Sequence, residues 1–367
     1  MRVNASWDQT NRRQRQSNIE LLRIVAMLII IGSHFSVHGG LKYSTSFLSV
    51  NRLWIQFLNM GGNIGVNVFI LISGYFLINS SALRIEKVLK LWLQIFTYSF
   101  GFYLLFLLSG QEHFSFRGLF DNAFPITTSS QYWFACNYFV LYLLSPFLNR
   151  LALGLEQKTY KHLLLLLFTI WCVIPTFLIY SWRGNNLTWF TFLYLLAGYI
   201  RIYSAGENWK CSTDFWIVFV TVVITFLTVI CLDAVAIRIP AVNGYTTYFY
   251  GKDRILILVI SVFLLLGFLK LDVGSNRIIN LLASTTFGVY LIHENRYFRD
   301  LLWNTVTRKA SIGDKDWLLP YSLAVIILVF SACSLLEYFR FYGLENRYMK
   351  AVKRLSQKIE DAVDSKV

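Results

Sequence analysis

Ten apolar stretches, each about as long as a membrane-crossing helix, recur along this chain of 367 residues. A helix needs roughly 20 apolar residues to cross a bilayer, and a backbone in lipid must satisfy its own hydrogen bonds. The composition agrees, because 56% of the residues are hydrophobic and only 15% are charged. We therefore predict an all-α integral membrane protein with about ten transmembrane helices in a single bundle. The predicted spans lie at about 19–38, 61–79, 91–109, 132–148, 163–180, 188–203, 213–232, 254–271, 279–295 and 318–338.

Lys and Arg residues set the predicted orientation of these spans. They are more numerous in the two tails and in the loops on the same side as the tails. Cytoplasmic segments carry such an excess, so we predict that both termini are cytoplasmic. The domains are then a cytoplasmic N-terminal tail over 1–18, a membrane domain over 19–338 and a basic cytoplasmic tail over 339–367. The last is expected to be a helix that anchors on the anionic inner leaflet.

The net charge of +14 does not indicate nucleic-acid binding, because the basic residues form short clusters between apolar runs. The five cysteines are scattered and show neither metal-type nor redox-type spacing. Phosphate-binding loops, hydrolase elbows and dinucleotide fingerprints are missing from the sequence. The repeats and broken helices that many transporters carry are also missing.

Arg23 and His34 are two ionisable residues within the first apolar stretch. Their separation of eleven residues corresponds to about 16 Å of helical rise and nearly three full turns, so both side chains lie on one helix face with Glu20. Polar groups within a membrane are costly and often functional. This face suits acyl transfer, with His34 as a general base and Arg23 as a clamp for phosphate or carboxylate. Alternatively, Arg23 snorkels towards Glu20 and His34 makes a structural hydrogen bond.

Two further segments suggest binding functions. Arg84 and Lys87, three residues apart after the second span, are positioned to hold a polyphosphate from the cytoplasm, or they are ordinary positive-inside charge. Tyr132 and Trp133 begin the fourth span. They are candidates for stacking on a sugar, or they belong to the aromatic belt at the membrane interface.

His293 and Glu294 end the ninth span, at a predicted depth similar to that of His34. Two imidazoles and a carboxylate at one depth suit a general base with its orienting partner. A metal site is the less favoured alternative, because these residues lack a tight ligand spacing such as HExxH. A structural cap at the helix end is the simplest alternative.

Four sequence blocks in this order resemble the acyltransferase 3 family of membrane acyltransferases, specifically bacterial polysaccharide O-acetyltransferases. The blocks are Arg23 followed after ten residues by His34, SGYFL at 73–77 with basic residues after it, YWF to LLSPFLN over 132–149, and TFGVYLIHE at 286–294. The resemblance covers essentially the whole chain and implies ten helices, an acyl-CoA donor bound from the cytoplasm and His34 as the catalytic histidine. The family's second motif has two arginines where this chain has Arg84 and Lys87, and Lys90 is a rival for the second position.

We therefore expect a multi-pass acyltransferase of the bacterial cytoplasmic membrane that moves an acetyl group from acetyl-CoA to a hydroxyl of a cell-envelope glycan. His34, His293 and Glu294 are the expected catalytic residues. Arg23, Arg84 and Lys87 are expected to bind the donor, and Tyr132 and Trp133 the acceptor. No permanently bound cofactor and no metal are expected, and both direct transfer and an acyl-histidine relay fit. A transporter or flippase of a glycan or lipid-linked sugar is the alternative. The expected partners are the donor, the acceptor and the lipid bilayer, and the oligomeric state is left open.

Overall fold

The computed structural model describes residues 17–38, 40, 47–80, 82–128, 132–178, 184–206, 208–307 and 311–364. The described residues form helices joined by turns, with no strand among them. Most of the predicted N-terminal tail, residues 1–16, lies outside the described range. The elements in chain order are α1 (Ser17–Val37), α2 (Val50–Leu77), α3 (Ile85–Leu108), α4 (Phe116–Ala123), α5 (Pro125–Thr128), α6 (Trp133–Gly154), α7 (Gln157–Phe168), η1 (Thr169–Val173), α8 (Ile174–Phe177), α9 (Asn186–Tyr203), α10 (Cys211–Arg238), η2 (Pro240–Tyr245), η3 (Tyr248–Tyr250), α11 (Ile255–Lys270), α12 (Arg277–His293), α13 (Arg296–Asp300), η4 (Leu301–Val306), α14 (Leu318–Arg340), η6 (Phe341–Glu345) and α15 (Asn346–Asp364).

Six helices among the described residues are long and apolar enough to cross a membrane. They cover Ser17–Val37, Val50–Leu77, Ile85–Leu108, Gln157–Phe177, Cys211–Arg238 and Leu318–Ile359. The prediction of an all-helical integral membrane protein is therefore confirmed. The four other predicted spans also form helices, namely α6, α9, α11 and α12, but these do not meet the same length and hydropathy criteria. The number of crossings thus stays a prediction.

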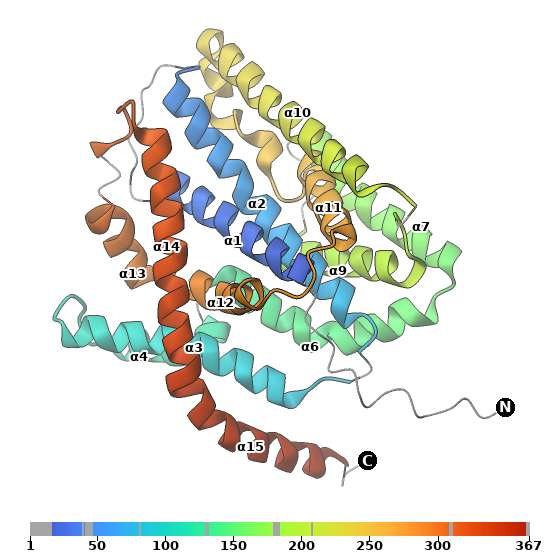
Figure 1. Ribbon diagram of the computed structural model, residues 1–367, viewed down its shortest axis with the longest axis vertical. Coiled ribbons are helices and arrows are strands. Elements are labelled where there is room, and N and C mark those ends of the chain that lie inside the picture. Colours follow the sequence, from blue (N-terminus) through green and yellow to red (C-terminus); the bar gives the residue numbers. More distant parts are fainter. Residues whose placement is uncertain are drawn as a thin grey trace.

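Several helix boundaries differ from those predicted. α2 begins at Val50, eleven residues before the predicted start at 61, because the side chain of Ser49 caps it by accepting from the backbone N–H of Arg52. The boundary at 338 is not a helix end. α14 continues through the π-helical segment η6 into α15, which bends away near the C-terminus in Figure 1.

α1 is the central helix of the bundle. It packs on α2, α11, α12 and α14, and Figure 1 shows it beside α2 in the middle of the view. The two backbones approach closely at Gly65 of α2, where an added Cβ atom would lie 2.7 Å from the carbonyl oxygen of Ala26. Small residues allow such backbone contact between membrane helices. The register of α1 against α2 is therefore fixed along the segment between Arg23 and His34.

A buried ion pair joins α2 to α10. Arg52 donates from Nε and Nη2 to the two carboxylate oxygens of Asp233, both at 2.9 Å, and Gln56 donates to the same carboxylate at 3.2 Å. The Asp233 side chain is fully buried. A carboxylate there needs such partners, since an isolated buried charge is very costly.

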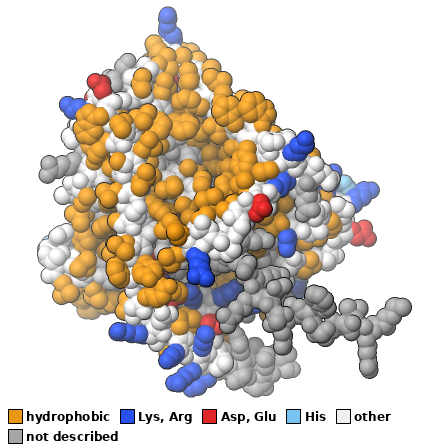
Figure 2. Space-filling view, in the orientation of Figure 1, with side chains coloured by type: hydrophobic (Ala, Val, Ile, Leu, Met, Phe, Trp, Pro, Cys, Tyr) orange, Lys and Arg blue, Asp and Glu red, His pale blue; other side chains and the backbone are white. Residues whose placement is uncertain are grey.

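The outer surface carries much apolar area. Large hydrophobic side chains on α10 and α14, such as Phe219, Ile224, Ile327 and Leu328, are at least 46% exposed. Figure 2 shows apolar side chains across much of one face, with Lys and Arg towards its margins. Such a surface is typical of a protein that faces lipid rather than water.

Candidate active site

Two helix ends bring the catalytic candidates together. His34 lies in the last turn of α1, and His293 is the final residue of α12. Glu294 follows as the C-cap, with its backbone N–H bonded to the carbonyl oxygen of Tyr290 at 3.1 Å. The next residue, Asn295, caps α13 with its side-chain oxygen and donates from Nδ2 to the hydroxyl of Tyr132 at 2.8 Å. The chain direction after α12 is thus fixed by side-chain hydrogen bonds, which hold Glu294 towards α1.

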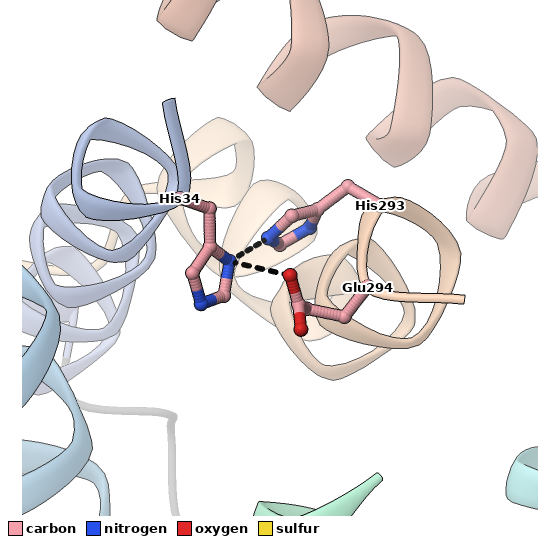
Figure 3. A group of neighbouring side chains, drawn as sticks. All are labelled: His34, His293 and Glu294. Atoms are coloured by element: carbon pink, nitrogen blue, oxygen red, sulfur yellow. Dashed lines mark hydrogen bonds and ion pairs between the residues drawn. The ribbon is translucent and has the colours of Figure 1, made fainter. Parts of the chain in front are cut away.

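The hydrogen bonds assign the ring protons of the two histidines. His293 Nδ1 lies 2.6 Å from the carbonyl oxygen of Val289, which can only accept, so this nitrogen carries hydrogen. In the neutral ring, His293 Nε2 is then an acceptor, and it lies 2.9 Å from His34 Nδ1. His34 Nδ1 is therefore the donor, and Glu294 Oε1 lies 3.2 Å from the same nitrogen. His34 Nε2 keeps its lone pair, and Figure 3 shows it directed away from both partners.

Two further charged or titratable side chains contact Glu294. His38 donates from Nε2 to Glu294 Oε1 at 2.7 Å, and Arg299 Nη1 lies 3.8 Å from Oε2. Neither residue was among the sequence-based candidates. His38 follows His34 by four residues, which is one helical turn, so its position on the same face was available from the spacing alone. No spacing in the sequence relates Arg299 to His34 in the same way.

A single large cavity connects the predicted donor and catalytic residues. Its volume is about 1410 Å³, and its lining includes Arg23, Lys87, His34 and Glu294. The lining also includes apolar and aromatic side chains, among them Met27, Ile30, Val66, Phe69, Leu91, Phe134, Tyr138 and Phe287, and further cations, Arg117, Arg296 and Arg299. The cavity is therefore long enough to expose one ligand to both ends of α1.

The cationic end is formed by α1 and α3. Arg23 lines the cavity there, its side chain 36% exposed and its Nε atom without a hydrogen-bond partner, while the nearest oxygen of Glu20 is 4.0 Å away. Lys87 and Lys90 line the same end. Arg84 is the N-cap residue of α3 and does not line the cavity.

Lys90 differs from Lys87 in its partners. Its ammonium group lies 2.6 Å from Glu345 Oε1, and Glu345 in turn accepts from Arg340 at 2.6 Å. Lys90 is therefore already paired with the segment that joins α14 to α15. Lys87 has no such carboxylate partner among the described ion pairs, so its charge faces the cavity.

The two aromatic candidates at the start of α6 occupy different environments. Tyr132 is fully buried and its hydroxyl donates to the carbonyl oxygen of Leu291 at 2.9 Å, so it supports the end of α12 and is not part of the cavity wall. Trp133 lines the cavity, with the ammonium group of Lys252 5.0 Å from its ring centroid. Burial lowers the pKa of Lys252, which also bonds to Asn186.

His34, His293 and Glu294 also meet the proximity condition for a metal site, because their ligand atoms lie within 4.8 Å of one another. His293 donates from Nδ1 to the carbonyl oxygen of Val289, and metal-binding histidines often make such a bond with the ring nitrogen that does not bind the metal. The same contacts also suit a general base, His34, with His293 and Glu294 as its hydrogen-bond partners. Treatment with a chelator distinguishes a metal site from a general-base site.

Comparison with known proteins agrees with the resemblance noted in the sequence. A family model described as an acyltransferase domain matches residues 16–337. Searches of curated proteins and of solved structures found no match. The matched range contains α1 through most of α14, and thus both ends of the cavity. The chain belongs to the acyltransferase 3 family and is a membrane acyltransferase.

Proposed function

We propose that the protein transfers an acetyl group from acetyl-CoA to a hydroxyl of a cell-envelope glycan, with His34 as the general base. The observation that carries this proposal is the cavity shared by Arg23, Lys87 and His34. It gives one ligand access to cations at one end and to an imidazole with a free lone pair at the other.

The cationic end suits the phosphates of coenzyme A. Arg23 and Lys87 supply charge-assisted donors for phosphate oxygens, and Arg23 Nε has no competing partner. About 16 Å of helical rise separates Arg23 from His34, so an extended donor bound at its phosphates directs the thioester along the apolar wall. Arg84 takes a lesser part in this proposal, because its side chain lies outside the cavity lining.

The chemical step uses the free nitrogen of His34. Nε2 removes the proton from the acceptor hydroxyl as its oxygen attacks the thioester carbonyl carbon. The carbon–sulfur bond of the resulting tetrahedral intermediate then breaks, and the imidazolium returns the proton to the departing thiolate. Glu294, 3.2 Å from Nδ1, stabilises the imidazolium while it exists, and His293 fixes the ring through its bond to Nδ1.

The proposed topology follows the sequence argument. Ten crossings with both termini in the cytoplasm put Arg23 near the inner face of a bacterial cytoplasmic membrane and His34 nearer the outer face. The donor then enters from the cytoplasm and the acceptor from outside. Trp133, in the cavity wall, is available to stack on a sugar ring of the acceptor.

The transporter alternative is disfavoured by membership of an acyltransferase family. The test uses a strain that lacks the gene and is complemented with the wild type, His34→Gln or His162→Gln. His162 is exposed on α7 and serves as the matched control. Acetate released by mild base from the isolated envelope glycans is measured.

We expect the wild type and His162→Gln to restore the released acetate and His34→Gln not to restore it, with equal amounts of protein in the membrane. Loss of a general base typically lowers the rate about 100- to 10,000-fold. Unchanged acetate after gene deletion would refute glycan acetylation. Full restoration by His34→Gln would refute the role of His34.

A further inference from the structure

Tyr290 is a cavity-wall residue to which no role has yet been given. It lies on α12 one turn before Glu294, so both side chains face the cavity from the same helix face. Its ring is held by aromatic neighbours, with centroid distances of 5.5 Å to Phe134 and 6.3 Å to Phe287. Only 5% of the residue is exposed. The hydroxyl therefore has a fixed position.

The hydroxyl of Tyr290 is buried, and its hydrogen has no acceptor among the described residues. A polar group beside it is the backbone N–H of Phe134 in the first turn of α6. That group can only donate, so it leaves the hydroxyl hydrogen of Tyr290 without an acceptor. Two other buried tyrosines differ: the hydroxyls of Tyr160 and Tyr194 each donate to an oxygen at 2.8 Å. The hydroxyl of Tyr250 also lacks a described partner, but Tyr250 is outside the cavity lining. An unused buried donor needs an explanation.

Two imidazole donors near His34 already have acceptors. His293 uses Nδ1 on Val289, and His38 donates to Glu294. Arg299 lies within 4 Å of Glu294 and Asp300. Acyl transfer requires a donor for the oxygen of the thioester carbonyl, because this oxygen becomes negatively charged when the carbon is attacked.

We propose that Tyr290 is a catalytic residue whose hydroxyl donates a hydrogen bond to the carbonyl oxygen of the acyl-CoA thioester. In the step derived above, the carbon–oxygen double bond opens as the acceptor oxygen adds, and the electron pair moves onto this oxygen. The bond from Tyr290 shortens at that point. The double bond reforms when the carbon–sulfur bond breaks, and Tyr290 keeps its own proton throughout. This inference rests on the proposed function.

The direct test is infrared spectroscopy of acetyl-CoA labelled with carbon-13 at the carbonyl. The protein carries His34→Gln to prevent turnover and is compared with and without Tyr290→Phe. Tyr138→Phe is the matched control, because Tyr138 also lines the cavity and its hydroxyl lies 3.4 Å from Ser73. A hydrogen bond lowers the carbonyl stretching frequency. We therefore expect a higher frequency with Tyr290→Phe than with the parent or with Tyr138→Phe.

A second measurement strengthens the bond instead of removing it. Incorporation of 3,5-difluorotyrosine at position 290 keeps the ring and makes its hydroxyl a better donor, so the frequency should fall further. In the protein with native His34, Tyr290→Phe should lower kcat about 100- to 1,000-fold, with little change in KM for acetyl-CoA. An unchanged frequency or an unchanged kcat in Tyr290→Phe would overturn this inference and leave the proposed function standing. Failure of the wild type to bind acetyl-CoA would overturn the proposed function, and this inference with it.

Discussion

Replacing Glu294 by Gln tests the proposal that Glu294 stabilises a positive charge on His34. The substitution keeps size and an acceptor oxygen but removes the negative charge 3.2 Å from His34 Nδ1. At an effective dielectric constant of about 20, two unit charges at this separation attract by about 5 kcal/mol. The carboxylate is also shared with His38 at 2.7 Å and Arg299 at 3.8 Å.

We expect Glu294→Gln to lose about half of this attraction at the transition state. The full value is not reached because neighbouring charges, and solvent at the 18% exposed side chain of His34, screen the interaction. A loss of about 2.7 kcal/mol corresponds to about a 100-fold lower kcat, since each 1.36 kcal/mol changes the rate tenfold. In the proposed mechanism, the imidazole of His34 is neutral until it takes the proton of the acceptor. KM for acetyl-CoA should therefore change little.

The assay is thiol release from saturating acetyl-CoA by membranes that contain the endogenous acceptor. Glu112→Gln is the matched control, because Glu112 also lines the cavity but belongs to the segment between α3 and α4. It should leave kcat near the wild-type value. If Glu294→Gln retains kcat within threefold of the wild type while His34→Gln is inactive, Glu294 does not stabilise the imidazolium and the electrostatic argument is wrong.

Three further outcomes follow from the structure. Lys87→Gln should raise KM for acetyl-CoA about tenfold, since a hydrogen bond to a charged group contributes about 1.5 kcal/mol or more. The control Lys158→Gln, at an exposed position on α7, should leave KM unchanged. Equal KM values in the two variants would show that Lys87 does not bind the donor. Dialysis against EDTA should leave the rate of thiol release unchanged, and a loss restored by added zinc would instead assign the His34 cluster to a metal. Arg52→Met should destabilise the protein by about 3–5 kcal/mol in a denaturant titration, because the buried charge of Asp233 then has no cation and keeps only the hydrogen bond from Gln56. Adding Asp233→Leu should recover most of that loss. An unchanged midpoint in the single variant would contradict the pairing.

The sequence predicted the membrane class and the residues of the cluster better than it predicted their contacts. Arg23 and His34 share a helix face because of their spacing, and the cavity includes both. The approach of His293 to His34 joins positions 259 residues apart, and only the packing of α12 on α1 determines it. The pairing of Arg52 with Asp233 likewise depends on how α2 meets α10.

The two aromatic candidates illustrate a local limit. Tyr132 is the N-cap residue of α6 and Trp133 is its first residue, so the helical period does not determine which of the two faces the cavity. The sequence does not settle this either, because both side chains are large and each has a polar atom that needs a partner. The structure resolves this through Tyr132, whose hydroxyl bonds to Leu291.

The central position of α1 gives the site its geometry. Neighbours on several sides and the backbone contact at Gly65 prevent α1 from rotating or sliding independently. The distance between Arg23 and His34 is therefore set by a single rigid element and not by loops. In the proposed function, a donor held at its phosphates would present its thioester at a constant depth. α12 packs on the same helix and would position Glu294 and Tyr290 at that depth. Acyl transfer depends on such alignment of base, carboxylate and carbonyl, and one helix provides the common reference for all three.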